Sequence, residues 1–187
     1  MATTSDLKVG DFLRFNGELL VLEEYQHRTP GNLRAFYQAK MRNVKNGRIT
    51  ENRFRSGEEV EIVRVERKQY QYLFHDGASY HFMDQETFEQ IPIDEKILGE
   101  GAKFLKEGVV VEVMFDGTEP IGADLPFNVE LEVIETVPGV RGDTANPGTK
   151  PAKVQTGATV NVPLFINEGD IVKVDTRTGE YLERVKR

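Results

Sequence analysis

The sequence predicts an all-β protein built from three small barrels, and three observations support this prediction. Short runs of Val, Ile, Phe, Tyr and Thr are separated by Asn-Gly, Asp-Gly and Pro-Gly dipeptides, the pattern of strands joined by tight turns. The pattern restarts near residues 64 and 128, and only one short segment reads as helical. Units of about 60 residues made of short strands are typical of small β-barrels. When a sheet closes into a barrel it leaves no exposed strand edges, so few helices are needed to cover them.

The first unit, 1–64, is dominated by a long antiparallel ribbon. We expect strands at 18–28 and 35–44 on either side of TPGNLR, then a turn at KNGR into a strand over ITENRFR. In the second strand, alternation places Ala35, Tyr37, Ala39 and Met41 on one face and Arg34, Phe36, Gln38, Lys40 and Arg42 on the other. One face should therefore pack, with Tyr37 in the core, and the other should be cationic.

The second and third units, 65–128 and 129–187, continue the β pattern. In the second, YQYLFHDGASYHFMD predicts a hairpin around Asp76-Gly77, DEKILGEGAKFLKEG predicts a helical turn or two, and VVVEVMFDGTEPIGADLP returns to strands. In the third, VELEVIET is followed by a Gly- and Pro-rich stretch and then by further strands up to the C-terminal residues.

Charge is distributed unevenly along this acidic chain of 187 residues, whose net charge is -7. The three units carry +2, -8 and -1, yet the segment 28–55 holds eight basic residues and a single acid, Glu51. A localised positive field of this kind can steer a polyanion while the rest of the surface repels it. The alternative is a solvated hairpin whose basic side chains protect a sheet edge.

Several kinds of chemistry find no support in the sequence. The chain has no Cys, and His27, His75 and His81 lack the spacing of metal ligands. Adjacent carboxylates such as Glu23 and Glu24 are expected to point to opposite sides of a strand, which makes them poor acid and base partners. No Gly-rich phosphate loop opens a helix. We therefore expect no enzyme, no cofactor and no bound metal.

No apolar run approaches the ~20 residues that cross a bilayer, and the N-terminus lacks the features of a signal peptide. The expectation is a cytoplasmic protein without a membrane partner.

The last third carries the most specific motif. KPAKVQTGATVNVPLFINEG, from Lys150 to Gly169, has Lys, Ala, Gly, an aliphatic residue, Val-Pro and a closing Gly at the spacings of the bacterial elongation factor P signature. GDT (142–144), IVKVDTRTGEYLERV (171–185) and the start LKVGDFLRFNGELLVLEEYQH agree as well. The whole chain resembles this family.

The resemblance implies an SH3-like N-terminal barrel and two OB-fold barrels, arranged as an L that imitates tRNA. It implies that the protein binds the ribosome between the peptidyl-tRNA and exit sites, contacts ribosomal RNA and proteins, and promotes peptide-bond formation at consecutive prolines without a catalytic side chain. The basic hairpin would follow the acceptor arm of peptidyl-tRNA through Arg28, Lys40 and Arg42. Its tip, at the acceptor end, would comprise Pro30, Gly31, Asn32, Leu33 and Arg34.

The tip departs from the family pattern. Many members read Pro-Gly-Lys-Gly there, with the Lys carrying a lysyl-type modification, but Asn32 takes the place of that Lys. An Asn amide is neither nucleophilic nor charged, so it cannot accept a lysyl group through an amine. Either the tip works unmodified, with Asn32 hydrogen-bonding to RNA and Arg34 bringing the charge, or Arg34 is itself the functional or modified residue and a modifying enzyme acts near it. Alternatively, Gly31 and Asn32 simply make a tight turn, since both residues tolerate positive φ.

By the same resemblance, the third unit faces the small subunit and exit site through Gly142, Asp143, Thr144, Tyr181 and Arg184. For Tyr181 and Arg184 the alternative is that the ring packs in the barrel and the guanidinium is solvated. A monomer is expected. The alternative function is an OB-fold regulator or chaperone that binds free tRNA or mRNA, whose affinity for naked tRNA should be high and fall steeply with salt.

Overall fold

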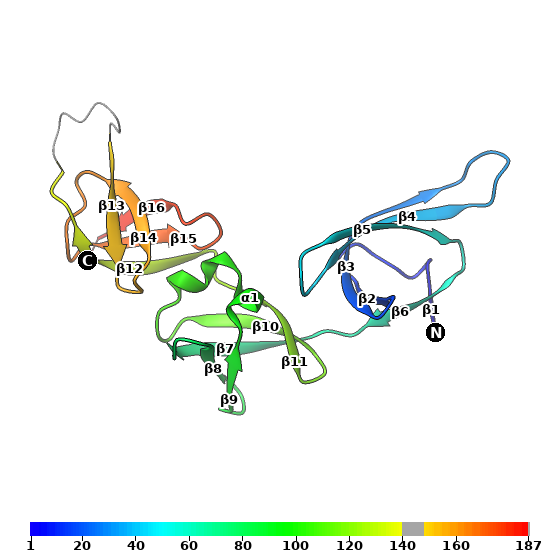
Figure 1. Ribbon diagram of the computed structural model, residues 1–187, viewed down its shortest axis with the longest axis horizontal. Helices are drawn as coiled ribbons and strands as arrows, with labels where there is room; N and C mark the ends of the chain where they lie inside the picture. Colours follow the sequence, from blue (N-terminus) through cyan, green and yellow to red (C-terminus); the bar gives the residue numbers. More distant parts are fainter. Residues whose placement is uncertain (140–147, 187) are drawn as a thin grey trace. The chain divides into compact units, whose positions relative to one another are not determined.

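The structure is a computed structural model that describes residues 1–139 and 148–186 (Figure 1). The prediction of an all-β chain is confirmed, because the strands form three sheets that curve into half-barrels. Helical segments of the described residues are α1 (Glu95–Leu98) and η1 (Glu100–Phe104), in the segment predicted to hold a turn or two of helix.

The packing of the chain defines two compact units. One consists of residues 1–67 with 114–122, and the other of residues 68–113 with 123–187. The boundaries near 64 and 128 and the L-shaped arrangement stay predictions.

The N-terminal sheet contains the hairpin that the sequence singled out. Its strands, in order across the sheet, are β1 (Ala2–Thr3), β6 (Glu59–Val63), β2 (Phe12–Phe15), β3 (Glu18–Arg28), β4 (Phe36–Asn43) and β5 (Ile49–Arg55). Side chains alternate between the two faces, so one face carries the core, which consists of Leu7, Leu13, Leu20, Leu22, Ala39, Met41 and Phe54. Ala39 and Met41 lie on the face that alternation assigned to packing.

The central sheet is built on the predicted Asp-Gly hairpins. Across the sheet its strands are β11 (Glu119–Asp124), β10 (Val110–Asp116), β7 (Glu66–His75), β8 (Tyr80–Asp84) and β9 (Gln90–Ile93). The turn between β7 and β8 places Gly77 at a φ of 95°, a conformation that favours glycine.

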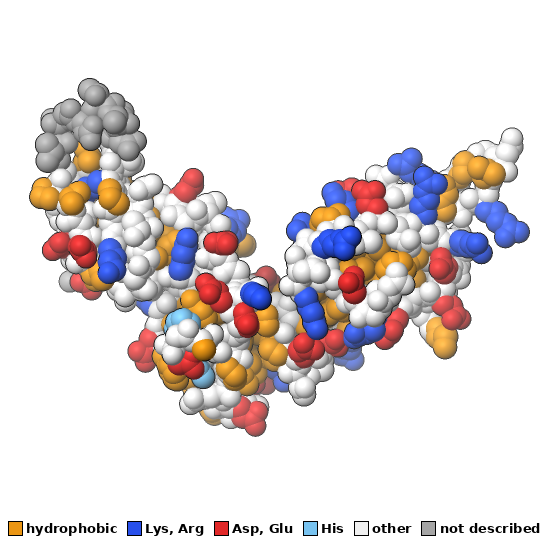
Figure 2. Space-filling view, viewed as in Figure 1, with side chains coloured by type: hydrophobic (Ala, Val, Ile, Leu, Met, Phe, Trp, Pro, Cys, Tyr) orange, Lys and Arg blue, Asp and Glu red, His pale blue; other side chains and the backbone are white. Residues whose placement is uncertain are grey.

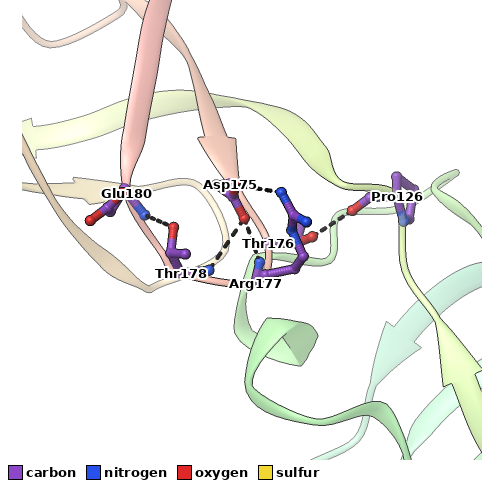
Figure 3. A network of polar contacts seen from close by, with 6 residues as sticks. All are labelled: Pro126, Asp175, Thr176, Arg177, Thr178 and Glu180. Carbon is purple, nitrogen blue, oxygen red and sulfur yellow. Dashed lines mark hydrogen bonds and ion pairs between the residues drawn. The ribbon is translucent and has the colours of Figure 1, made fainter.

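The C-terminal sheet has the order β14 (Thr159–Pro163), β13 (Thr149–Val154), β12 (Asn128–Thr136), β15 (Ile171–Asp175) and β16 (Tyr181–Val185). Its core is rich in valine, as expected for half-buried strands, and it also includes Phe104 of η1. In Figure 3 the Asp175 carboxylate accepts hydrogen bonds from the β15–β16 turn, and the Thr176 hydroxyl donates to the Pro126 carbonyl. A Cβ on Gly101 would lie 2.8 Å from the Thr176 carbonyl oxygen, so this close approach requires glycine.

No helix in the described part of the chain has the length and apolar character needed to cross a membrane. Residues 1–139 and 148–186 also contain no group of His, Asp and Glu side chains arranged to hold a metal ion.

Candidate nucleic-acid interface

The candidate interface is the β3–β4 hairpin with the loop that joins its strands. The two strands pair from Leu20 opposite Asn43 to Arg28 opposite Phe36, and β5 pairs along β4 up to the same point, Phe36 opposite Arg55. The loop, residues 29–35, therefore lies beyond the last paired residues of the sheet, where Figure 1 shows it as the end of the projecting hairpin.

A β-bulge in β3 changes the expected charge pattern. The register of β3 against β4 shifts between Leu22 and Glu24, so Glu23 is an extra residue in its strand. Glu24 accepts a hydrogen bond from Lys40 at 2.9 Å, and Glu23 accepts one from Arg42. The prediction that Glu23 and Glu24 point to opposite sides is wrong, because the bulge interrupts the alternation and lets both carboxylates reach one face of β4.

These ion pairs reduce the positive field of the hairpin. Figure 2 shows acidic side chains among the basic ones over the N-terminal sheet. The hydrogen bond and negative charge of Glu24 raise the pKa of the Lys40 ammonium, so Lys40 stays charged while its field is locally balanced. Two of the cations predicted to contact RNA, Lys40 and Arg42, are thus paired within the protein, and the acids that pair them lie just outside the segment 28–55.

The other two cations of the β3–β4 hairpin, Arg28 and Arg34, have different surroundings. Arg28 donates to the Gln26 side chain at 3.0 Å. For Arg34 the described residues show no side-chain hydrogen bond or ion pair. The positive charge of β3, the loop and β4 that no carboxylate balances therefore belongs to Arg28 and Arg34, beside the loop. On the neighbouring strand β5, the Arg53 guanidinium lies 5.1 Å from the centre of the Phe36 ring.

The loop is held by little more than one turn. The Leu33 amide donates to the Pro30 carbonyl at 3.2 Å, which closes a turn around Gly31 and Asn32. The turn itself was expected, but neither Gly31 nor Asn32 has a positive φ, so it does not depend on their tolerance of that conformation. A Cβ on Gly31 would meet nothing within 4 Å.

The tip side chains point into solvent. Gly31, Asn32, Leu33 and Arg34 are all exposed, and Leu33 is 76% exposed with no core cluster around it. Pro30 is half-buried. The structure thus brings the five predicted tip residues together in one loop, and the side chains of Asn32, Leu33 and Arg34 in it are exposed and belong to no core cluster.

An aromatic column extends along the packed face of the hairpin toward this loop. Tyr25 and Tyr37 stack with their ring centres 4.8 Å apart, and Tyr37 and His27 stack at 4.6 Å. Alternation placed Tyr37 in the core; the ring lies on the predicted packed face, but it is only half-buried and packs against the core cluster from outside. The sequence analysis assigned His27 no role. Its position two residues after Tyr25, and opposite Tyr37 on the next strand, could have indicated that the three rings share one face of the hairpin.

The predicted contacts of the third unit fall into three groups. Gly142, Asp143 and Thr144 lie outside the described residues. Tyr181 is half-buried and packs against the C-terminal core. Arg184 is exposed, 4.0 Å from the Asp170 carboxylate and 5.3 Å from the centre of the Phe165 ring.

The signature residue Lys150 has a structural role. It is 5% exposed, and its ammonium donates to the Val137 carbonyl at 2.6 Å. Nearby, the Thr136 hydroxyl donates to the Pro151 carbonyl at 3.0 Å. These bonds join the two chain segments that flank residues 140–147.

Comparison with known proteins covers the whole chain. Residues 3–60 match the family model described as the elongation factor P KOW-like domain, residues 65–123 match the elongation factor P OB domain, and residues 129–184 match the model described as elongation factor P, C-terminal. Elongation factor P of Chloroherpeton thalassium is 58% identical over 189 residues, covering 100% of both chains. Elongation factor P of Roseiflexus castenholzii is 49% identical over 187 residues, again covering 100% of both.

Solved structures agree on the fold. Eukaryotic translation initiation factor 5A from Methanococcus jannaschii superposes with a TM-score of 0.53 at 21% identity, covering 67% of this chain and 92% of that one. A translation initiation factor of the same family from Naegleria fowleri gives a TM-score of 0.52 at 16% identity. From the three matched domains and the full-length identity of its relatives, the chain belongs to the elongation factor P family and is a translation elongation factor.

Proposed function

We propose that this protein binds the ribosome between the peptidyl-tRNA and exit sites and promotes peptide-bond formation at consecutive prolines. The observation that carries the proposal is the loop of the β3–β4 hairpin, which lies beyond the last paired residues and exposes Asn32, Leu33 and Arg34 without using them in the fold. Side chains that a fold does not need are available to a partner, and in this family the partner is the ribosome.

The proposed mechanism is positional. Proline reacts slowly as donor and as acceptor in peptide-bond formation. Holding the acceptor end of peptidyl-tRNA in a reactive geometry speeds the reaction, because it lowers the entropic part of the activation barrier. In this mechanism Arg34 contacts a phosphate and Asn32 hydrogen-bonds to the RNA, while the ribosome performs the chemistry. The protein contributes no catalytic group and acts in the cytoplasm as a monomer.

The tip is proposed to work without a lysyl modification. Asn32 lacks the amine that such a modification requires. The turn does not require a positive φ at Gly31 or Asn32, so folding does not dictate which residues occupy these positions. Both residues can therefore serve contact with RNA.

The ion pairs of β3 and β4 favour a docked factor over a binder of free RNA. Glu23 and Glu24 balance Arg42 and Lys40, so the hairpin attracts naked tRNA less strongly than its sequence predicts. Weak binding to naked tRNA, with a shallow salt dependence, is the expected result; tight and steeply salt-dependent binding would favour the free-RNA regulator instead.

The decisive experiment is reconstituted translation of a message with three consecutive proline codons, using ribosomes from the same source, with and without the unmodified recombinant protein. The proposal predicts that the unmodified protein increases synthesis past the prolines. If it fails, the same assay with protein isolated from native cells, together with the mass of its tip peptide, tests a modification near Arg34. Failure of both preparations would overturn the proposal.

A further inference from the structure

The turn between β8 and β9 is built like two other turns of the chain. In each, the amide of the first residue donates to the carbonyl of the sixth, and the amide of the fifth donates to the carbonyl of the first; the first residues are Asn43, Asp84 and Asp175. The side-chain oxygen of that first residue also accepts hydrogen bonds from the amides of the third and fourth residues, as Figure 3 shows for Asp175. The three turns therefore share one hydrogen-bond pattern.

The fifth residue of this pattern has a positive φ, and in one of the turns it is not glycine. Gly47 has a φ of 71° and Gly179 a φ of 75°, whereas the β8–β9 turn holds Phe88 at this position with a φ of 61°. A positive φ is unfavourable for a bulky side chain and free of steric cost for glycine. The Phe88 side chain is 68% exposed, so burial of the ring does not explain why phenylalanine stands there. Backbone strain that the fold does not need indicates a functional side chain.

Phe88 also differs from the other exposed phenylalanines in the surroundings of its ring. Each of the others in the described chain lies against a histidine ring or an arginine: Phe74 against His81 at 4.5 Å, Phe127 against Arg177 at 4.7 Å and Phe165 against Arg184 at 5.3 Å. These distances join the ring centre of the histidine, or the guanidinium carbon of the arginine, to the centre of the phenylalanine ring. Among residues 1–139 and 148–186, no such partner contacts the ring of Phe88. Its face is therefore open to a group from another molecule.

The exposed charges next to Phe88 in the chain are acidic. Glu86 and Glu89 are exposed, and the described residues provide no ion pair to either carboxylate. The nearby cation Lys68 acts on the buried Asp84, whose pKa is lowered first by the hydrogen bond from the Glu86 amide and also by the Lys68 charge. An aromatic face beside carboxylates repels phosphates and attracts a cation, and arginine is the cation that most often makes this contact.

We propose that Phe88 is a docking site for an arginine of a partner protein, with the guanidinium over the ring and Glu86 or Glu89 pairing its charge. The site follows the arrangement that the chain itself uses at Phe127 and Phe165, but it takes the arginine from outside. A basic protein surface is the partner that fits, because the two carboxylates disfavour a nucleic acid. The inference rests on the proposed function only in placing this partner on the ribosome.

The first test measures association of the full chain with ribosomes from the same source by co-sedimentation. Phe88→Asn should weaken association about tenfold, the scale of a desolvated cation–π contact. Because Asn tolerates a positive φ, this variant should melt at the temperature of the unchanged protein or above it. Phe88→Tyr, which keeps the ring, should associate within about twofold of the unchanged protein.

Phe74→Thr is the matched control. It removes an exposed ring that already lies against His81, and it should leave association unchanged. Thermal unfolding of each variant checks that the fold is retained. The proposal is overturned if Phe88→Asn associates as the unchanged protein does, or if Phe74→Thr weakens association as much as Phe88→Asn.

The flanking charges provide a test of sign. Replacing Glu86 and Glu89 together by Gln should weaken association severalfold at low salt, because the arginine loses the carboxylates that pair it. A general effect of net charge predicts the opposite, since the chain becomes less negative and ribosomal RNA is anionic. A gain in association would therefore overturn the proposal.

Photocrosslinking identifies the class of partner. A chain with p-benzoylphenylalanine in place of Phe88, irradiated on ribosomes, should become attached to a protein at a segment that contains an arginine. Changing that arginine to methionine should weaken association as much as Phe88→Asn does, and the two changes together should weaken it no further than either alone. Attachment to RNA alone, no attachment, or additive effects of the two changes would contradict the proposal.

Translation of the triple-proline message separates this inference from the proposed function. If the unchanged protein stimulates synthesis, and Phe88→Asn associates and stimulates equally, the docking site fails and the proposed function stands. If the unchanged protein gives no stimulation while it associates through Phe88, the proposed function fails and the docking site stands. An unchanged protein that does not co-sediment with ribosomes contradicts both.

Discussion

The β3–β4 and β7–β8 hairpins are built alike and end differently. Each is an antiparallel pair with a register shift in its first strand, between Leu22 and Glu24 in one and between Tyr72 and Phe74 in the other. Each also ends in a histidine stacked on a tyrosine of the opposite strand. The strands therefore do not explain why one hairpin is a candidate RNA interface and the other is not.

The difference lies in the loops. In the β7–β8 turn the Asp76 carboxylate accepts hydrogen bonds from the amides of Ala78 and Ser79, each at 2.8 Å, and contacts the His81 ring at 2.7 Å. In the β3–β4 loop the turn is closed by the single bond between Leu33 and Pro30. The β7–β8 loop satisfies its polar groups internally, whereas the β3–β4 loop has only one internal hydrogen bond among its described residues.

The largest expected effect concerns the open loop. Arg34→Ala should reduce synthesis past three prolines about tenfold, because a charge-assisted contact to a phosphate is lost, while thermal unfolding stays unchanged. Arg48→Ala, an exposed arginine in the turn before β5, is the matched control and should leave synthesis unchanged. Equal stimulation by the Arg34 variant and the unchanged protein would remove Arg34 from the mechanism.

Glycine substitutions compare the two loops directly. Gly77→Ala should lower the free energy of unfolding by about 1 to 2 kcal/mol, because Gly77 has a φ of 95°. Gly31→Ala should change the free energy of unfolding by less than about 0.5 kcal/mol, since its φ is not positive and a Cβ there meets no atom within 4 Å. Urea denaturation measures both. Equal destabilisation would contradict the view that only the β7–β8 loop depends on its glycine.

A third prediction concerns the bulge in β3. Replacing Glu23 and Glu24 together by Gln should uncover the charges of Arg42 and Lys40 and strengthen association with ribosomes severalfold at low salt, with the gain disappearing as salt increases. Co-sedimentation over a salt series measures the change. Glu86→Gln with Glu89→Gln, which removes the same charge from the β8–β9 turn, is the control; an equal gain there would show a net-charge effect alone.

The smallest expected effect is the pH dependence of the closed loop. The hydrogen bond to His81, helped by the two amides, lowers the pKa of the Asp76 carboxyl well below its usual range. A lowered pKa in the folded state stabilises the protein above the ordinary carboxyl pKa of about 3.9, and this contribution is lost as the pH falls below that value.

Asp76→Asn should therefore lower the melting temperature at pH 7 and approach the unchanged protein as the pH falls below about 4. Circular dichroism over a pH series measures the difference between the two proteins. His81→Phe, which removes the largest cause of the shift but keeps a ring against Phe74, should remove part of the pH dependence. A difference that stays constant down to low pH would contradict this assignment.

The strands of the hairpin were predictable because side-chain alternation has a period of two residues. The predicted strands 18–28 and 35–44 correspond to Glu18–Arg28 and Phe36–Asn43, and Ala39, Met41 and Tyr37 lie on the expected face. The signature around Lys150 and the Asp-Gly turns were equally local signals, so the family and the all-β class could also be recognised. The open loop was predictable as a segment, since Pro30 and Gly31 interrupt the pattern.

The charge of the interface was not predictable, because it depends on the bulge. Counting residues over 28–55 gives a strongly basic segment, but Glu23 and Glu24 lie outside that window and reach Arg42 and Lys40 only through the register shift. The same holds for His27, whose ring is placed by Tyr37 of another strand. In both cases the partner comes from across the sheet, and its position depends on the pairing of strands rather than on neighbouring residues.

The sequence by itself thus determined the all-β class, the family and the position of the hairpin tip, because turn dipeptides, alternation and a spaced signature are properties of short segments. The tertiary structure alone decided which cations are balanced, which histidine ring is held flat and open, and which loop satisfies its own hydrogen bonds. These properties depend on distances between groups that are far apart in the chain, and only the register of the folded sheet sets those distances.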